Sequence, residues 1–438
     1  MANLGRQMQT GEGGQQGSVA NESGLRNLGA RIDADNGRKR STRRNGKARW
    51  STRKKVVVSL LSAIVVLAAF VGAGYGYLWY RYSQIDKQHI SAEVAVQGGG
   101  PFTILVIGSD TRAGESASAA QAFGSSSLVT GQRSDVVQLW RVTPSQKTIQ
   151  VMSIPRDTVV SMLPPDSAEY GTYNRINTSY NTGANQLVKT ITANFGIPIN
   201  HVVVVDFSGF QDAVQALGGV YMDFPYPAKD AYSGLNITTT GCQLLNGAQA
   251  LAVARSRHYQ YYENGYWHYD GTSDFGRIQR QDVFLKAMMT AAKSKVSPLT
   301  VNAFIGSLHE GISIDDGFGF NELIGLALTY HSYDPADLQG QTLPTEAANG
   351  FGDLGDVLTV QQPEAQQMLV SIFGSSLQEP TNFPPDANGD PNPPPPVTTT
   401  TAPPPTSSTK SSGAAASATT TPTTTPPPSF NPTNCSPS

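Results

Sequence analysis

The chain has 438 residues, which by length alone could form two or three domains, but its composition changes along the sequence and leaves less material for folded domains. Its net charge of −2 hides an asymmetry: residues 1–55 contain 13 basic and 4 acidic residues, and the remainder has 18 basic against 29 acidic residues, a balance of −11. The positive charge is therefore a local feature of the N-terminal end. The acidic balance of the remainder excludes a protein that is basic along its whole length.

The N-terminal residues 1–55 are predicted to form a disordered basic arm. The block from Arg38 to Lys55 has ten cations and no acid, in a Gly-, Ser- and Asn-rich context. Such a cluster could bind nucleic acid, but it lacks interleaved aromatic residues and directly precedes an apolar segment. We therefore attribute it to membrane topology and expect no nucleic-acid partner.

The apolar segment Val56–Tyr80 contains 25 residues and no charge. As a helix it would be roughly 37 Å long, enough to cross a bilayer. A signal peptide would have a shorter apolar core closer to the N-terminus. With the basic block before it, the positive-inside rule predicts a single-pass protein of the cell membrane, with a cytoplasmic N-terminus and everything after the helix extracytoplasmic.

The remaining sequence divides into three parts by composition. Residues 81–100 are predicted to be a juxtamembrane connector that ends in "QGGG", and residues 101–378 to be one large folded domain. Residues 379–438 become rich in Pro, Thr and Ser with few large apolar side chains, so they cannot bury enough surface to offset chain entropy. We expect a disordered tail there.

Within the folded part, short β-branched runs alternate with helical patterns. Strands are predicted at 102–108, 135–142, 147–154, 201–207 and 219–225. Helices are predicted at 185–195, 207–217, 246–258 and 273–295, with further helices at 299–310, 320–330 and 361–373. Several strands are too uniformly apolar to face water, so the pattern predicts an α/β domain whose central sheet is covered by helices.

The two cysteines, Cys242 and Cys435, allow one disulfide bond if this part of the chain is exported. Such a bond would close a loop of almost two hundred residues, for which loop entropy predicts on the order of 5 kcal/mol of stabilisation. A free or intermolecular thiol is the alternative, because a bridge to the end of a flexible tail would be unusual.

Arginine outnumbers lysine by nine to four within residues 101–290. Arginine is the better bidentate partner of phosphate oxygens, and loops at strand ends form the ligand crevice of α/β folds. Surface ion pairs are the alternative for any single arginine. The arginines at predicted element ends are Arg112, Arg133, Arg156, Arg175, Arg255, Arg257, Arg277 and Arg280.

Two aspartates lie at neighbouring strand ends. Asp110 follows the first predicted strand and Asp135 begins the second, each near an arginine. A pair of carboxylates beside phosphate-binding arginines is typical of a Mg²⁺ (or Mn²⁺) site, whereas a plain salt bridge is the alternative. The histidines and cysteines show no zinc spacing, and the sequence has no Walker lysine or nucleophile elbow.

The segment "SDFGRIQRQDVFLKAMM" at 273–289 predicts a helix with a mixed face. Its opening arginines oppose the positive end of the helix dipole, which indicates a missing anion. A ligand with an anionic head and a hydrocarbon tail would match this face; a core helix with a solvated first turn is the alternative. Asp274 precedes the face, which consists of Arg277, Arg280, Gln281, Phe284 and Met288.

Five segments in order resemble the LytR-CpsA-Psr (LCP) family: "FTILVIGSDTR", "QRSDVVQLWRVTPSQKTIQVMSIPRDTVV", "RINTSYNTGANQLVKTITANFGIPINHVVVVDFSGFQDAVQALGGVYMDFP", "LNGAQALAVARSRH" and "DFGRIQRQDVFLKAM". The resemblance spans about 101–295 and continues weakly to about 372. It implies a single-span membrane protein with an extracytoplasmic α-β-α domain built on a mixed sheet. Members are phosphotransferases that move a glycopolymer from a polyprenyl pyrophosphate carrier to peptidoglycan as a phosphodiester.

The resemblance also implies site roles. Asp110 and Asp135 would hold Mg²⁺ on the pyrophosphate, and with Arg112, Arg133, Arg156, Arg277 and Arg280 they would form the catalytic group. Asp157 and Asp274 are both candidates for the base. The residues expected to bind substrate are Arg175, Arg255, Arg257, Asp274, Gln281, Phe284 and Met288.

Three departures from the family pattern leave questions open. Arg175 stands where lysine is common, and insertions at 114–131 and 259–273 flank the site; the second is either a sugar-facing lid or a packed loop. The separate C-terminal domain found in many actinobacterial members is expected to be absent, with the Pro/Thr tail in its place. The sequence resembles the actinobacterial branch, for which arabinogalactan is the expected cargo. A polyprenyl-pyrophosphate pyrophosphatase and a non-enzymatic wall-binding scaffold are the alternative functions.

Overall fold

The computed structural model describes residues 51–94, 99–110, 134–294, 298–307, 311–349, 351–395 and 429–435. The chain forms two units, Met1–Gly72 and Ala73–Ser438. The first unit contributes the start of helix α2 (Thr52–Tyr82), which includes the predicted apolar segment. Its mean hydropathy of 2.7 over the most apolar stretch, with none of that stretch buried, makes α2 long and apolar enough to cross a membrane.

A seven-stranded mixed sheet forms the centre of the second unit, with the order β1-β14-β7-β2-β3-β4-β15. The pairs β2·β3, β3·β4 and β7·β14 are antiparallel, whereas β2·β7, β1·β14 and β4·β15 are parallel. The bounds are β1 Asp86–Gln88, β2 Phe102–Ser109, β3 Ser134–Thr143, β4 Thr148–Ser153, β7 His201–Val205, β14 Ile312–Asp315 and β15 Gln339–Thr342.

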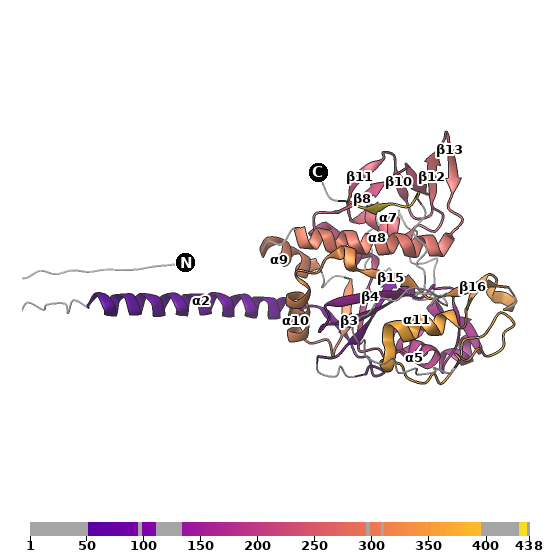
Figure 1. Ribbon diagram of the computed structural model, residues 1–438, viewed down its shortest axis with the longest axis horizontal. Helices are drawn as coiled ribbons and strands as arrows, with labels where there is room; N and C mark the ends of the chain where they lie inside the picture. Colours follow the sequence, from indigo (N-terminus) through magenta and orange to yellow (C-terminus); the bar gives the residue numbers. More distant parts are fainter. Residues whose placement is uncertain are drawn as a thin grey trace, which may run out of the picture. The chain divides into compact units, whose positions relative to one another are not determined.

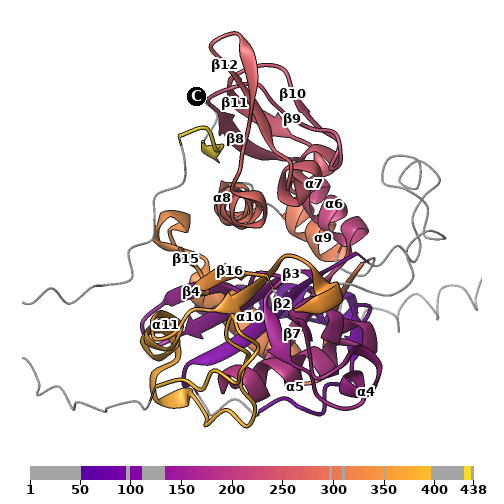
Figure 2. The ribbon, with the colours of Figure 1, turned by 90° about the vertical axis from the view of Figure 1, so that its right-hand side faces the viewer.

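Helices cover both faces of this sheet (Figures 1 and 2). Leu105 and Leu139 point to one face and join a buried cluster with α5 (Ala184–Phe195) and α11 (Glu364–Phe373). On the other face, Val151 packs near Leu285 and Met289 of α8 (Ser273–Ser294), and Ile104 packs near α10 (Phe320–Tyr330). The alternation along each strand therefore fills two apolar layers. The expected α/β architecture with a covered mixed sheet is confirmed.

A second lobe lies on the far side of α8 from the central sheet, as Figures 1 and 2 both show. It has a three-stranded sheet, β11-β8-β18, and a four-stranded sheet, β10-β9-β12-β13. One apolar cluster joins both sheets to α7 and α8. The lobe's elements are α6 Phe207–Ala216, β8 Val220–Phe224, β9 Ala228–Asp230, β10 Leu235–Ile237, β11 Gly241–Leu245, α7 Gly247–Arg255, β12 Gln260–Glu263, β13 Tyr266–Tyr269, α9 Pro298–Ser307 and β18 Thr433–Asn434.

Several short strands and helical segments complete the second unit. Two small antiparallel pairs form, β5 with β6 and β16 with β17. Their bounds, with the helical segments near them, are β5 Val159–Ser161, α4 Asp166–Tyr170, β6 Tyr173–Arg175, the 3-10 helix Ile176–Thr182, β16 Thr345–Ala348 and β17 Val357–Val360.

The end of the chain departs from the predicted disordered tail. Residues 379–395 pack on the domain, where the backbone of Thr381 and Asn382 donates hydrogen bonds to Ala193. Residues 429–435 add strand β18 to β8. The Pro-rich composition of both segments predicted disorder because neither has a hydrophobic pattern of its own. A few buried side chains are nevertheless enough to anchor such a segment to the folded domain.

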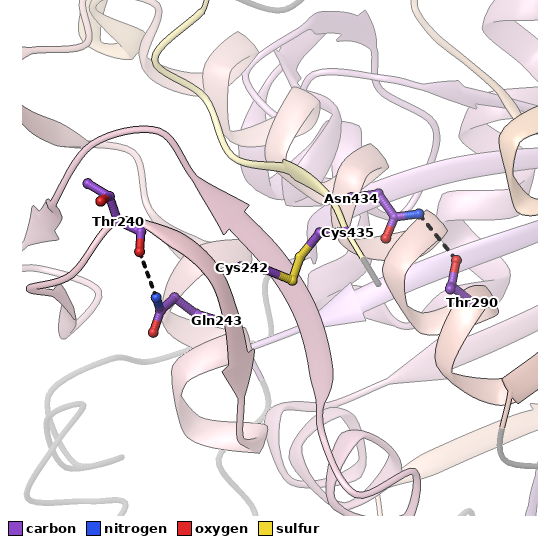
Figure 3. The surroundings of a disulfide bond; sticks show 6 residues. All are labelled: Thr240, Cys242, Gln243, Thr290, Asn434 and Cys435. Atoms are coloured by element: carbon purple, nitrogen blue, oxygen red, sulfur yellow. Dashed lines mark hydrogen bonds between the residues drawn. A yellow bond between two sulfur atoms is a disulfide. The ribbon is translucent and has the colours of Figure 1, made fainter. Parts of the chain in front are cut away.

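A disulfide bond joins Cys242 of β11 to Cys435, directly after β18, with 6.0 Å between their Cα atoms (Figure 3). The amide of Asn434 also donates to the hydroxyl of Thr290 on α8 at 3.2 Å. Of the two possibilities that the sequence left open, the structure has the intramolecular bridge.

Candidate active site

The C-terminal end of β2 lies beside the N-terminal end of β3 in the central sheet. Their antiparallel register pairs Ser109 with Ser134, which places the backbones of Asp110 and Asp135 at the same end of these two strands. The register thus brings the two backbones close together, whereas the expectation that the carboxylates of Asp110 and Asp135 meet stays a prediction. Arg112 and Arg133, expected beside them, lie outside the described residues, as does the insertion at 114–131.

Asp135 contacts two arginines from different elements. Its carboxylate accepts a hydrogen bond from Arg156, which follows β4, and its backbone oxygen accepts one from Nη2 of Arg277 on α8 at 2.8 Å. Burial on its own would raise the pKa of the Asp135 carboxyl, but Arg277, Arg156 and Arg255 outweigh burial and hold that pKa below its ordinary value. Asp135 therefore stays ionised.

Asp157 contacts three arginines. Its carboxylate oxygens lie 3.5 Å from Nε of Arg156, 3.2 Å from Nε of Arg175 and 3.1 Å from Nη2 of Arg257. Arg175 is also held by the backbone oxygen of Asp356 at 3.3 Å. These arginines come from the loop after β4, the end of β6 and the segment that follows α7, so three parts of the chain converge on one carboxylate.

Asp274, in the first turn of α8, completes the cluster. Its Oδ1 lies 2.6 Å from Nη2 of Arg277 and 3.4 Å from Nε of Arg257. The contacts form a closed ring whose members, in order, are Asp135, Arg156, Asp157, Arg257, Asp274 and Arg277, which returns to the backbone of Asp135. Each guanidinium is thereby fixed before any ligand arrives.

Cations outnumber carboxylates in this arginine–aspartate ring and its immediate neighbours. Arg175 adds a charge through Asp157, and Arg255 acts on Asp135 while lying 4.3 Å over the ring of Phe207. The side chains of Arg156, Arg175 and Arg257 are 21%, 29% and 28% exposed, whereas Arg277 is buried. Three partly exposed guanidinium groups thus offer donors to an anion, and arginine suits phosphate oxygens.

The ends of β3 and β4 pack closely against the first turns of α8 beside this ring. The charged Asp135 and Arg277 meet the apolar Ile154 and Ile278 there, and the space between these side chains does not admit a water molecule. Gln281, another predicted substrate-binding residue, lies at the same contact, and its amide donates to the backbone oxygen of Ala254 at 2.9 Å.

Asp110 and Asp135 are the carboxylates at this sheet edge that could hold a divalent cation. Within the described ranges, no group of three or more His, Cys, Asp or Glu side chains is arranged as a metal site. Mg²⁺ commonly binds one or two carboxylates, with water and substrate phosphate oxygens completing its octahedron. The ionised state of Asp135 therefore suits a metal that substrate helps to bind.

Arg280 differs from the expectation that it contacts the anionic ligand. Its side chain is fully buried; Nη1 lies 2.8 Å from Asp270 and 2.9 Å from Asn431, and Nη2 donates to the backbone oxygen of Ser256 at 2.9 Å. The guanidinium also lies 4.4 Å over the ring of Tyr259. Arg280 lies three residues after Arg277 on α8, and the rotation of the helix over this step directs its side chain toward the second lobe. Arg280 therefore forms a buried structural ion pair with Asp270.

Phe284 and Met288 lie one and two turns further along α8. Phe284 is buried and stacks on Phe210 with ring centroids 4.6 Å apart, and Met288 packs against the same apolar cluster. The structure thus places both side chains in the core between α8 and the second lobe. Their predicted role in lining a groove for hydrocarbon stays a prediction.

Sequence reasoning missed the partners of Arg280. Asp270 lies within a segment considered only as an insertion, although a buried arginine needs a partner. Asn431 lies in the proline-rich region and had no sequence signal that pointed to α8. Its amide also donates to Gln279 at 3.0 Å, so the segment 429–435 contributes directly to the helix that carries the site.

One family of known proteins is similar to this chain over most of its folded part. The model of the LytR_cpsA_psr family matches residues 77–372. The chain is 26% identical over 324 residues to the polyisoprenyl-teichoic acid–peptidoglycan teichoic acid transferase TagU of Enterococcus faecalis, covering 72% of this chain and 94% of the relative. It is also 26% identical over 354 residues to the corresponding TagV transferase of Bacillus subtilis, covering 76% of this chain and 80% of the relative.

Among solved structures, the LytR-Csp2A-Psr enzyme from Actinomyces oris is similar with a TM-score of 0.52 and 25% identity. The match covers 66% of this chain and 95% of that structure. The family match includes the described strand ends, the arginines of the ring and the helix α8 that holds Arg277. The chain therefore belongs to the LytR_cpsA_psr family.

Proposed function

We propose that this protein is a phosphotransferase that ligates a glycopolymer, carried on polyprenyl pyrophosphate, to peptidoglycan through a phosphodiester bond. The observation that carries the proposal is the arginine–aspartate ring, in which partly exposed arginines are fixed around three aspartates. The transferases TagU and TagV, named for moving teichoic acid from a polyisoprenyl carrier to peptidoglycan, support the same reaction class.

The exposed arginines bind the donor. Arg156, Arg175 and Arg257 direct N–H groups at the pyrophosphate oxygens, while Arg277 is held by Asp274 and fixes the position of the ring. Because the groups are held before substrate arrives, little reorganisation is needed as charge builds on the transferred phosphorus. Arg112, Arg133 and Arg255 are further proposed donors to the same oxygens.

The transfer exchanges one P–O bond for another. A muramic acid hydroxyl oxygen attacks the phosphorus that bears the glycan, the bond to the bridging oxygen breaks, and polyprenyl phosphate leaves. The hydroxyl proton goes to a carboxylate, for which Asp157 and Asp274 are the candidates. We propose Asp157 first, because its side chain is 19% exposed whereas that of Asp274 is 8% exposed.

Asp110 and Asp135 would hold Mg²⁺ or Mn²⁺, which when bound would neutralise charge on the pyrophosphate. The contribution of the chain is to keep Asp135 ionised through Arg277 and Arg156. Replacing Asp135 with Asn should raise the metal concentration required for half-maximal transfer far more than it raises the KM for acceptor. Equal effects on both would contradict a role at the metal.

We propose that α2 anchors the protein in the cell membrane with its N-terminus in the cytoplasm and the second unit outside. The ten cations before the apolar segment favour this orientation. The bond between Cys242 and Cys435 also fits it, since disulfides persist in oxidising compartments. A fusion reporter active only outside the cytoplasm, attached after Cys435, tests the orientation.

The central test uses the purified full chain in detergent with a lipid-linked glycan, peptidoglycan and Mg²⁺. Wild type should form a phosphodiester-linked product, and Arg257→Ala should reduce transfer at least about 100-fold, as removal of a charge-stabilising donor does. Lys189→Ala, an exposed cation on α5, is the control and should retain full activity.

Two outcomes would replace the proposal. Hydrolysis of the donor at the same rate with and without acceptor would identify a pyrophosphatase. Wall binding without any donor turnover would favour a scaffold. The cargo, which we propose to be arabinogalactan, is tested by comparing lipid-linked arabinogalactan with lipid-linked teichoic acid as donors.

A further inference from the structure

The four-stranded sheet of the second lobe has two unlike faces. In antiparallel pairs, residues opposite each other share a face, and the face changes at every position along a strand. The register pairs Tyr262 with Trp267 and Gln260 with both Tyr269 and Lys229. These side chains, with Asn236 opposite Lys229, therefore lie on one face, which we call the aromatic face.

The opposite face is covered over most of its length, with Tyr266 near the turn left exposed. Ala228, Leu235 and Ile237 join the apolar cluster of the second lobe, and Tyr261 stacks on Phe430 with centroids 4.4 Å apart and planes 5° apart. The segment held by the disulfide thus supports the sheet from behind. A sheet with one covered face normally carries polar side chains on the other.

The aromatic face instead exposes three large rings. Tyr262 and Trp267 are each 40% exposed and Tyr269 is 54% exposed. Tyr262 and Trp267 lie side by side, with centroids 5.4 Å apart, and Nζ of Lys229 lies 4.0 Å over the Trp267 ring. Exposed rings that are already held in place cost little entropy when a ligand stacks on them.

The hairpin that carries this face is rigidly turned. Asn264 and Gly265 connect β12 and β13 with positive φ angles of 53° and 91°, the pattern of a two-residue turn of type I′. Because such a turn matches the strand twist, it fixes the register and with it the spacing of the three rings.

The aromatic face is joined to the arginine–aspartate ring by the chain itself. Arg257 of the ring is followed by His258, whose imidazole lies 4.4 Å from the ring of the 79%-exposed Tyr232, with the two planes tilted by 38°. At the other side, Tyr269 is followed by Asp270, the partner of Arg280, and then by the first turn of α8 with Asp274. The aromatic face and the arginine–aspartate ring are therefore neighbours along the chain at both ends of the hairpin.

The charge of the aromatic face indicates which kind of ligand can bind to it. The six residues named above for this face include one cation, Lys229, and no carboxylate. A polymer with a phosphate in each repeat would need a row of cations, as the arginine–aspartate ring provides. An uncharged chain of pyranose sugars instead presents C–H groups to the negative faces of aromatic rings and amide or hydroxyl groups to Lys229, Gln260 and Asn236.

We propose that the aromatic face binds the acceptor, a β-1,4-linked strand of N-acetylated amino sugars, and guides its hydroxyl to the arginine–aspartate ring. The proposal rests on the proposed function for the identity of the acceptor. The donor's charged head occupies the arginines, and the aromatic face has no second group of cations for a phosphate-bearing chain.

Calorimetric titration of the full chain in detergent with chitohexaose, an uncharged β-1,4-linked N-acetylglucosamine hexamer, tests the proposal. Wild type should bind, and Trp267→Ala and Tyr262→Ala should each raise Kd about tenfold, the loss expected when one stacked ring is removed. Trp267→Phe keeps a ring and should restore binding to within about threefold of wild type.

Tyr266→Ala is the matched control, because Tyr266 is in the same hairpin and 58% exposed but lies on the opposite face against His268. Its Kd should stay within about twofold of wild type. Unchanged thermal unfolding of each variant confirms that the hairpin still folds.

Either equal Kd values for wild type, Trp267→Ala and Tyr262→Ala, or binding of poly(glycerol phosphate) or of arabinogalactan in place of chitohexaose, would overturn the proposal. The transfer assay with Arg257→Ala is independent of this titration. If Arg257→Ala loses transfer but Trp267→Ala and Tyr262→Ala do not weaken chitohexaose binding, the proposed function is supported and the proposed acceptor site is refuted. If Arg257→Ala keeps transfer but the two aromatic substitutions weaken binding, the proposed function is refuted and the sugar-binding face is supported.

Discussion

Arg277 and Arg280 lie three residues apart on α8 but make different kinds of contact. Arg277 joins the partly open arginine–aspartate ring, whereas Arg280 is enclosed with Asp270 and Asn431. Helical spacing alone predicts that both share a face, since residues three apart are neighbours on a helix. It cannot tell which of them meets the site, because that depends on how α8 is rotated between the sheet and the second lobe.

The buried pair of Arg280 and Asp270 provides a test at the residue scale. Asp270→Ala leaves a guanidinium buried without its counter-charge, which should lower the free energy of unfolding by about 3–5 kcal/mol. Urea unfolding of the full chain in detergent measures the change. Asp353→Asn, at an exposed position, is the control, and a loss for Asp270→Ala no larger than that of the control would contradict the buried-pair assignment.

Glu93 gives a test of pH dependence. Burial, with the negative charges of Asp315 and Asp316 nearby, raises the pKa of its carboxyl from an ordinary 4.5 to about 8. The folded state thus holds this proton more tightly than the unfolded state does, so its contribution to stability is present below pH 4.5 and is lost as the pH rises toward 8.

Glu93→Gln cannot lose a proton. Its free energy of unfolding relative to wild type should therefore increase steadily from pH 5 to pH 8 and then level off. Denaturant titrations at intervals of pH measure this difference, with Glu364→Gln at the exposed start of α11 as the control. A difference that does not vary with pH would refute the assignment.

At the scale of elements, the apolar runs of the sequence predicted which segments form strands, but not which strands pair with one another. The runs that form β2, β3, β4 and β7 are long and apolar, and the structure confirms them as neighbours in the central sheet. The run that forms β8 is equally apolar, yet it pairs with β11 and β18 in another sheet. An apolar run indicates a buried strand but does not name its partner.

Apart from β8, the strands of the second lobe are not predicted from the sequence, for another reason. β9, β10, β12 and β13 have three or four residues each, which is too short for a periodicity to emerge. One signal was present: the Asn264–Gly265 dipeptide between two aromatic runs is typical of a hairpin turn. The ring around Asp157 was predicted in part, since arginines at element ends were identified, but their common carboxylate required the folded structure.

Gly276 in the first turn of α8 gives a test at this scale. A Cβ there would lie 2.2 Å from the Thr272 hydroxyl and 2.4 Å from a carboxylate oxygen of Asp270, which Arg280 holds in place. Glycine to alanine normally favours a helix, but this collision should outweigh the preference and cost about 1–3 kcal/mol.

Gly271 is the matched control, because a Cβ at that position meets no atom within 4 Å. Thermal unfolding should show a lower Tm for Gly276→Ala and an unchanged Tm for Gly271→Ala. Stabilisation by both substitutions would mean that the first turn of α8 has more room than the structure describes.

At the scale of the whole molecule, the disulfide ties the chain's end to the lobe that carries the aromatic face. Cys242 and Cys435 are 193 residues apart, and loop entropy predicts a stabilisation of about 5 kcal/mol for a loop of this length. The same segment places Phe430 behind Tyr261 and Asn431 beside Arg280.

Replacing both cysteines with serine should therefore lower the free energy of unfolding by about 2–5 kcal/mol, since measured bridges often give less than the entropic value. Denaturant unfolding without reductant compares the double variant with wild type. Gln243→Ser, next to Cys242 and only partly buried, is the control. Equal stability of wild type and the double variant would show that non-covalent contacts alone hold the segment.

The position of Asn431 also imposes an order of assembly. It comes 151 residues after Arg280, so the guanidinium on α8 lacks one of its buried partners until residue 431 has been synthesised. A polypeptide interrupted before Asn431 contains every member of the arginine–aspartate ring, but Arg280, on the helix that carries Arg277, lacks its contact with Asn431. The surroundings of the site therefore reach their final form only after residue 431 has joined the fold.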